Sequence, residues 1–170
     1  MLVATYFGAQ EIQWSSKEEG TIGLITCILI IQLVAVVGAF LTSRASAKFG
    51  NIPTLIVINC IWAVSCGLAF FITLPIHFYV MATVAGFVIV GIQALSRSTY
   101  SKLLPETKDT ASFFSFYDVA EKIGIVIGMC FYGIIDQITG RPRVAFTILG
   151  IFFVAAIFLL RRVHKKGAVN

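Results

Sequence analysis

The sequence predicts an all-α fold, a polytopic helical bundle that lies in a membrane, and three observations support this prediction. Hydrophobic residues make up 58% of the 170 residues, against about 45–50% in soluble domains. Charged residues make up 12%, against a usual share of about 25%. Apolar stretches of roughly 20 residues, long enough to cross a bilayer as a helix, recur along the chain. The mean hydropathy of the chain is +0.93, so most of the protein surface is expected to face lipid.

The chain opens on an apolar segment, residues 1–9, that is too short to span a bilayer. We expect this segment to be the end of a transmembrane helix whose beginning is missing. Residues 10–20 are predicted to form an extracytoplasmic loop, residues 21–166 a five-span bundle, and residues 167–170 a cytoplasmic tail. A signal peptide is not predicted, because the residues before the first span are mainly acidic rather than basic.

Five membrane spans are predicted, and each boundary has a polar, proline or glycine residue within one or two positions. The second span begins near Pro53, where the first helical turn tolerates a missing N–H. The fourth is long and contains charges, and the fifth follows Pro142. In chain order the predicted spans are Thr21–Thr42, Pro53–Leu74, Phe78–Ser96, Phe113–Ile138 and Val144–Leu160.

The basic residues of the loops predict the orientation in the membrane. Nine lysines and arginines fall on one side, three on the other and one inside a span. The richer side is predicted to be cytoplasmic, so the C-terminus lies in the cytoplasm. Arg141 and Arg143, on the poorer side, go against this trend. The expected location is the cell inner or plasma membrane, or a vacuolar membrane in a eukaryote.

Composition and motifs also argue against other classes of protein. The net charge is +5, but the basic residues occur in short groups between apolar runs rather than on one face with interleaved aromatics, so no nucleic-acid partner is expected. The four cysteines lie in apolar runs without a CxxC pair, which predicts buried hydrophobic residues and no metal site. No HExxH, GxSxG or phosphate-binding glycine loop occurs, so neither an enzyme nor a cofactor is predicted.

The fourth predicted span concentrates ionisable residues in an otherwise apolar stretch. Asp118, Glu121 and Lys122 lie within five residues. Each charge near the bilayer centre costs at least about 2.5–3.5 kcal/mol, so such groups persist beside a cavity, beside one another or at the interface. Asp118 and Lys122 are four residues apart and share a helix face, so they are expected to pair and partly neutralise each other. Glu121 lies about 60° away on the same helix. The three residues therefore form one polar wedge.

Two interpretations of this polar wedge remain open. In the first, the wedge lines a path for a solute or a proton, which is the usual role of intramembrane ionisable residues. In the second, the span begins near Val119 and the charges lie in the headgroup layer. A helix that begins near Ala111 would place Lys122 roughly 16 Å along its axis, close to the middle of the membrane, which favours the first.

Neighbouring residues extend the prediction to packing and to the preceding span. Small residues at Ala120, Gly124 and Gly128 form a stripe that would let another helix approach closely. At the cytoplasmic end of the third span, Gln93 and the following Arg97 are four residues apart and share a helix face. Arg97 either reaches the interface as an anchor or pairs with an acidic residue of the polar wedge.

Two motifs resemble those of a known family. The basic hairpin Gly38–Asn51 is similar to the signature G-x-x-x-[DE]-[RK]-x-G-[RK] of the major facilitator superfamily, with Ala47 in place of the acidic residue. The string Gln93–Gly128 resembles the vacuole-effluxer branch of that superfamily, with the pattern Q-x-x-S-R-S, a proline, then F-F-x-x-Y-x-x-x-x-K. The I-T-G-x-x-R at 138–143 fits as well. The matching residues of the longer string are Gln93, Ser96, Arg97, Ser98, Pro105, Phe113, Phe114, Tyr117 and Lys122.

The resemblance implies the C-terminal half of a major-facilitator-type fold, and a secondary transporter that exports amino acids in characterised vacuolar members. The partners it implies are membrane lipid, a small-molecule solute and a missing N-terminal six-span half. The alternative is a non-transporting membrane subunit or scaffold that packs through its glycine stripe. The expected solute or proton pathway is Gln93, Arg97, Tyr117, Asp118, Glu121 and Lys122, and the expected cytoplasmic gating loop is Arg44, Lys48 and Gly50.

Overall fold

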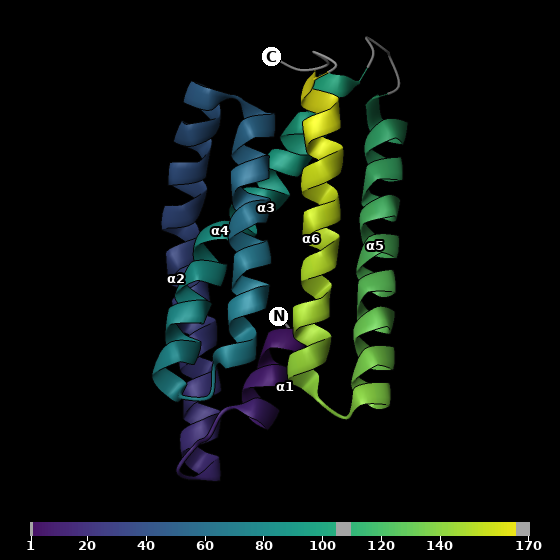
Figure 1. Cartoon of the computed structure of the whole chain (residues 1–170). Helices are drawn as coiled ribbons and strands as arrows, with labels where there is room; N and C mark the ends of the chain where they lie inside the picture. The colour runs from purple at the N-terminus through teal and green to yellow at the C-terminus, as the bar shows by residue number, and fades with distance from the viewer. Residues whose placement is uncertain (1, 105–109, 166–170) are drawn as a thin grey trace.

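The computed structural model describes residues 2–104 and 110–165, and nearly all of them are helical (Figure 1). No strand occurs in these two ranges, which confirms the predicted all-α fold class. The helices run up and down in a bundle, with α5 and α6 side by side along its edge (Figure 1). In order the elements are α1 Leu2–Glu11, α2 Lys17–Phe49, α3 Asn51–Leu68, the 3₁₀ helix η1 Ala69–Phe71, α4 Pro75–Leu103, α5 Thr110–Thr139 and α6 Pro142–Lys165.

Four helical segments of the described chain are long and apolar enough to cross a membrane: α2, α3 continued by η1, α4 and α6. Helix α5, which covers the predicted fourth span, is not among them. Its 30 residues carry the charges of the polar wedge, and at 1.5 Å per residue it is about 45 Å long. That α5 also spans the bilayer remains a prediction.

Some predicted boundaries were wrong. Helix α1 continues to Glu11 and α2 begins at Lys17, so the expected loop 10–20 is reduced to residues 12–16. Ser16 caps α2 by accepting a hydrogen bond from the Glu19 N–H at 3.1 Å, and the Glu19 carboxylate accepts one from the Ser15 N–H at 3.1 Å. This near-reciprocal capping satisfies one N–H of the first turn, that of Glu19, and the N–H of Ser15 just before the cap. The predicted tail 167–170 lies outside the described residues.

The predicted second span also ends earlier than expected. Helix α3 stops at Leu68 and tightens into η1, and residues 72–74 are not helical before Pro75 opens α4. The start of α3 at Asn51 agrees better with the predicted start of the second span near Pro53. Gly50 makes the turn from α2 with a φ of 90°, a conformation that a side chain would strain, and Pro53 follows in the first turn of α3.

Helices α2 and α4 pack closely through glycines. A Cβ built on Gly38 would lie 2.1 Å from the Phe87 carbonyl oxygen, and one on Gly86 would lie 2.7 Å from the Ile31 carbonyl oxygen. Small residues of this kind let helix backbones approach in lipid. The stripe predicted on α5 has no such neighbour, since nothing lies within 4 Å of a Cβ at Gly124 in the described chain. The same holds for Gly128, and Ala120 is exposed. Packing of this stripe against another helix therefore remains a prediction.

The Gly38→Ala variant should lower the free energy of unfolding by about 1–3 kcal/mol, because the new methyl group meets backbone atoms that a rotamer change cannot move. The Gly124→Ala variant is the matched control. It has open space and should be neutral or stabilising by up to about 1 kcal/mol, since alanine favours a helix. Thermal unfolding of both purified variants in detergent measures the difference. An equal effect of the two substitutions would contradict the close α2–α4 packing.

Aromatic side chains attach α1 to the rest of the bundle. The Phe7 ring lies 5.4 Å from the Phe146 ring of α6 and 6.5 Å from the Phe78 ring of α4, measured between centroids. The indole N–H of Trp14 donates to the Gly8 carbonyl oxygen at 2.9 Å. The residues between α1 and α2 are thereby folded back against α1, and the end of α1 is fixed beside α6.

Candidate functional site

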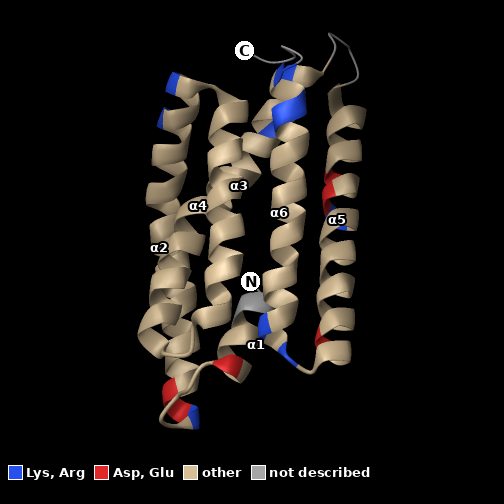
Figure 2. Cartoon of the chain, viewed as in Figure 1, with Lys and Arg blue, Asp and Glu red and all other residues tan. Residues whose placement is uncertain are grey.

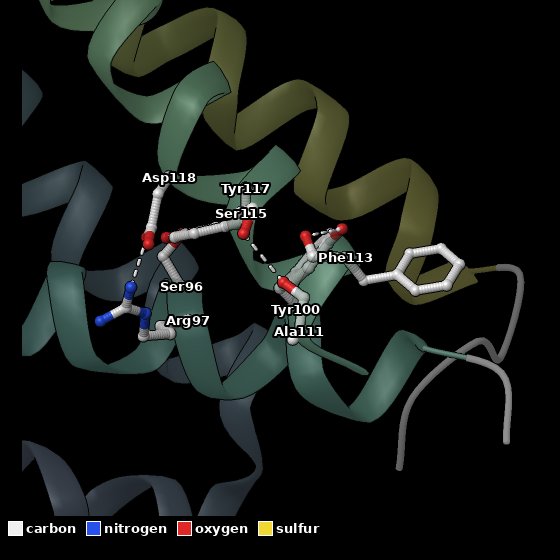
Figure 3. A network of polar contacts seen from close by, with 8 residues as sticks. All are labelled: Ser96, Arg97, Tyr100, Ala111, Phe113, Ser115, Tyr117 and Asp118. Atoms are coloured by element: carbon white, nitrogen blue, oxygen red, sulfur yellow. Dashed lines mark hydrogen bonds and ion pairs between the residues drawn. The ribbon is translucent and has the colours of Figure 1, made fainter. Parts of the chain in front are cut away.

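An ion pair joins the last part of α4 to the first part of α5. The Arg97 guanidinium donates to the Asp118 carboxylate, and the two side chains point toward one another across the gap between the helices (Figure 3). Next to it, the Tyr117 hydroxyl donates to the Ser96 hydroxyl oxygen at 3.0 Å. The Arg97 guanidinium also lies 5.9 Å from the centre of the Tyr117 ring. One turn of each helix therefore supplies two adjacent polar contacts.

A second pair of contacts lies one turn further along α4. The Tyr100 hydroxyl donates to the Phe113 carbonyl oxygen at 3.0 Å, within the first turn of α5 (Figure 3). The Tyr100 ring also packs against the Tyr117 ring, with 4.9 Å between centroids. Residues four apart share a helix face, so Ser96 and Tyr100 on α4 meet Phe113 and Tyr117 on α5 in register.

The Arg97–Asp118 pair is open to the outside of this chain. The Arg97 side chain is 55% exposed and the Asp118 side chain 49% exposed. Of the two roles considered for Arg97, the structure has the ion pair with an acidic residue of α5. Gln93, one turn earlier on α4, is exposed.

The rest of the polar wedge is arranged differently from the expected Asp118–Lys122 pairing. Asp118 is bound by Arg97, and among the described residues no ion pair involves Glu121 or Lys122. Lys122 is exposed and Glu121 half-buried on α5. Within the described part of the chain, the polar wedge thus presents one acidic and one basic group without an ion partner, next to a paired arginine and aspartate.

Two residues of the predicted gating loop, Arg44 and Lys48, lie in the last turns of α2, and only Gly50 lies between α2 and α3. Both basic residues contact aromatic rings. The Arg44 guanidinium lies 5.0 Å from the centre of the Phe40 ring, and the Lys48 ammonium lies 5.3 Å from that of Phe49. Gly50 makes the turn itself. A gating role for this loop remains a prediction.

Sequence reasoning missed the role of Arg143, which it treated only as an exception to the charge bias and as part of a motif. The Arg143 guanidinium forms an ion pair with the Glu11 carboxylate at 3.1 Å. It also donates to the carbonyl oxygens of Phe70 at 3.1 Å and Ile72 at 2.9 Å. Arg143 therefore ties the end of α1 and the segment around η1 to the start of α6. The sequence offered one signal for this role, an arginine on the side of the membrane with fewer basic residues. Its partner Glu11 lies too far away in the sequence for the contact to be predicted.

The charges are distributed unevenly along the bundle. Basic residues gather where α2 and α6 end. Acidic residues lie around α1, at the start of α2 and on α5, and some basic residues also lie at the α1 end (Figure 2). The four cysteines are free, and the prediction that they are buried was wrong in part. Cys27 and Cys66 are buried, whereas Cys60 and Cys130 are exposed. Among the described residues, no three histidine, cysteine or acidic residues are placed to hold a metal ion.

Comparison with known proteins links this architecture to one family. The family described as "Vacuole effluxer Atg22 like" matches residues 1–170. A relative from Bacillus subtilis, named "Uncharacterized MFS-type transporter YxiO", is 29% identical over 89% of this chain and 35% of its own length. No solved structure matches the chain.

Fungal relatives give the same result. "Autophagy-related protein 22" from Eremothecium gossypii is 29% identical over 88% of this chain and 32% of its own length. The protein of the same name from Pichia angusta is 30% identical over 91% of this chain and 28% of its own length. The chain thus spans about a third of the length of these relatives. This integral, multi-pass membrane chain belongs to the Atg22-like vacuole effluxer family.

Proposed function

We propose that this chain is the C-terminal half of a secondary transporter, in which the polar faces of α4 and α5 line the path of a small-molecule solute. The Arg97–Asp118 ion pair is the observation that carries the proposal. It joins two helices of an apolar bundle, yet about half of each side chain remains exposed. Charges inside a membrane protein are costly unless they face a cavity or a partner, and they commonly mark solute and ion pathways.

The proposed solute is a zwitterion such as an amino acid, which would be exported. A zwitterion needs both an acidic and a basic contact. Asp118 and Glu121 supply carboxylates, and Arg97 and Lys122 supply cationic groups, on adjacent turns of α4 and α5. The exposed amide of Gln93 adds a neutral donor and acceptor on the same side of α4.

The proposal includes an N-terminal half and an orientation. Transporters built from repeats hold the solute near the bilayer midplane between their halves, so this chain would supply one wall of the site. The basic end of the bundle, with the C-terminal end of α6, is placed in the cytoplasm because cytoplasmic loops carry the excess of lysine and arginine (Figure 2).

A scaffold subunit is the second candidate, and one observation favours it. Gly124 and Gly128 on α5 have open space beside them in the described chain. A helix face of this kind could pack closely against a helix of another subunit. A scaffold does not require the ionisable residues beside that stripe. Solute flux that depends on these residues therefore separates the two candidates.

The test is solute flux through the full-length protein, meaning this chain with its proposed N-terminal half, reconstituted with Arg97→Gln, Asp118→Asn or both. We expect each single variant to lower flux by about tenfold or more, in line with the loss of a charged contact of roughly 1.5–3 kcal/mol. An ion pair this exposed is worth at most about 1 kcal/mol to stability, so folding should be preserved.

The double variant completes a mutant cycle that measures coupling between the two residues. If they act as a pair, the double variant should lose less flux than the sum of the single losses, on a logarithmic scale. Wild-type flux in all three variants, at equal protein abundance, would contradict the transport proposal for this site.

A further inference from the structure

A polar cavity lies at the basic end of the bundle, apart from the Arg97–Asp118 pair. Its volume is about 630 Å³, and it is open to the outside and lined by the end of α2, the start of α3 and the last turns of α4 and α6. Four helices and the tight turn at Gly50 thus contribute to a single concave site. Its lining includes Ser46, Phe49, Asn51, Ser98, Lys102 and His164.

Asn51 organises the polar lining of the cavity. Only 5% of Asn51 is exposed. Its side-chain oxygen accepts hydrogen bonds from the Ser46 hydroxyl at 2.6 Å and the Lys102 ammonium at 3.2 Å. Its side-chain nitrogen donates to the Ser98 hydroxyl oxygen at 3.0 Å. The network therefore fixes Ser98 and Lys102, which lie four residues apart on α4, toward the same cavity.

This network leaves hydrogen-bond donors for a ligand. An ammonium group has three N–H donors, and Lys102 uses one of them on Asn51. The Ser98 oxygen accepts from Asn51, so its O–H hydrogen is available to donate. His164 of α6 also lines the cavity, and none of the described residues that line it is acidic. The cavity thus combines a positive charge with several donors, which suits an anion that only accepts hydrogen bonds.

The surroundings of the cavity indicate a lipid as the source of such an anion. Phe49 at its rim is 64% exposed and Leu103 on α4 is 46% exposed, so apolar side chains flank a basic site at the end of a membrane bundle. Basic pockets between transmembrane helices bind anionic headgroups. We propose that this cavity binds a phosphate group, presented by an anionic phospholipid of the adjacent leaflet.

The test is native mass spectrometry of the purified full-length protein with phosphatidylglycerol or phosphatidylcholine. Wild type should retain phosphatidylglycerol preferentially. Lys102→Gln should weaken this retention by about tenfold, because a charge-assisted hydrogen bond is lost. Lys102→Arg, which keeps the charge, should restore most of it. Lys17→Gln removes an exposed lysine at the other end of the bundle and should leave retention unchanged.

Addition of inorganic phosphate separates the two possible sources of the group. If phosphate displaces phosphatidylglycerol from wild type but has no effect in Lys102→Gln, the site accepts a soluble phosphate as well. If phosphate does not compete and the Lys102 effect persists, the lipid is the ligand. Equal retention of phosphatidylglycerol by wild type and Lys102→Gln would overturn the proposal, and so would an equal loss in Lys17→Gln.

Discussion

Replacement of Lys122 by alanine in the full-length protein should reduce solute flux to background and leave membrane insertion unchanged. Lys122 lies twelve residues after the start of α5, about 18 Å along the helix, where an ammonium group is costly in lipid. It is exposed in this chain, and among the described residues it has no ion pair. Its charge is therefore the one most available to a solute in the proposed pathway.

Two further substitutions make this expectation specific. Lys122→Arg should retain only part of the flux, because a guanidinium is bulkier, planar and effectively never deprotonated. Lys17→Ala removes an exposed lysine at the start of α2, outside the proposed pathway, and should transport like wild type. Flux and surface abundance are measured side by side for all variants. Near-normal flux in Lys122→Ala would place the polar wedge in the headgroup layer and remove it from the pathway.

The helices whose position follows from their own residues could be predicted from the sequence. Apolar runs of about 20 residues correspond to α2, α3, α4 and α6, because helix length in a bilayer follows from its thickness. Pro53, Pro75 and Pro142 lie in the first turns of their helices, as a residue without an N–H should. Hydropathy could not show that α3 changes to η1 before residue 72, because those residues are as apolar as the helix.

The candidate site was predictable only in part, because its contacts join residues far apart in the sequence. Helical spacing correctly places Asp118, Glu121 and Lys122 close together on α5, but it suggested that Asp118 would pair with Lys122. The structure pairs Asp118 with Arg97, 21 positions away, which is one of the two roles that the sequence left open for Arg97. The i,i+4 rule identifies the possible partners of Asp118 on its own helix. It cannot compare them with a residue on another helix, such as Arg97.

Glycine patterns had the same limitation. The regular spacing of Gly124 and Gly128 was visible in the sequence, yet a Cβ built on either would meet no other helix within 4 Å in the described chain. Gly38 and Gly86 pack against backbone atoms, and they lie in different helices, so no single repeat marks them. Which glycines allow close approach depends on which helix faces pair.

Replacement of Arg143 by alanine should lower the free energy of unfolding by about 3 kcal/mol, the largest stability effect expected in this chain. Removal of one partner of a buried ion pair typically costs about 3–5 kcal/mol, and the low end applies because Arg143 and Glu11 are about one-fifth exposed. The variant also leaves the carbonyl oxygens of Phe70 and Ile72 without their donor.

Arg141→Ala is the matched control, since Arg141 is exposed and only two residues away. It should change the free energy of unfolding by less than about 0.5 kcal/mol, as surface substitutions usually do. Arg143→Lys should recover part of the loss, because one ammonium can keep the Glu11 ion pair but cannot reproduce the forked geometry that reaches two carbonyls. Thermal unfolding in detergent measures all three.

Comparison with Glu11→Gln separates the two contributions of Arg143. A glutamine at position 11 removes the charge pair and leaves the carbonyl contacts at Phe70 and Ile72 intact, so it should destabilise less than Arg143→Ala. If the two variants lose equal stability, the ion pair with Glu11 accounts for the whole stabilising contribution of Arg143, and the carbonyl contacts add nothing measurable. If Arg143→Ala unfolds like Arg141→Ala, then Arg143 does not stabilise the bundle, and the aromatic contacts of Phe7 are sufficient to keep α1 in place.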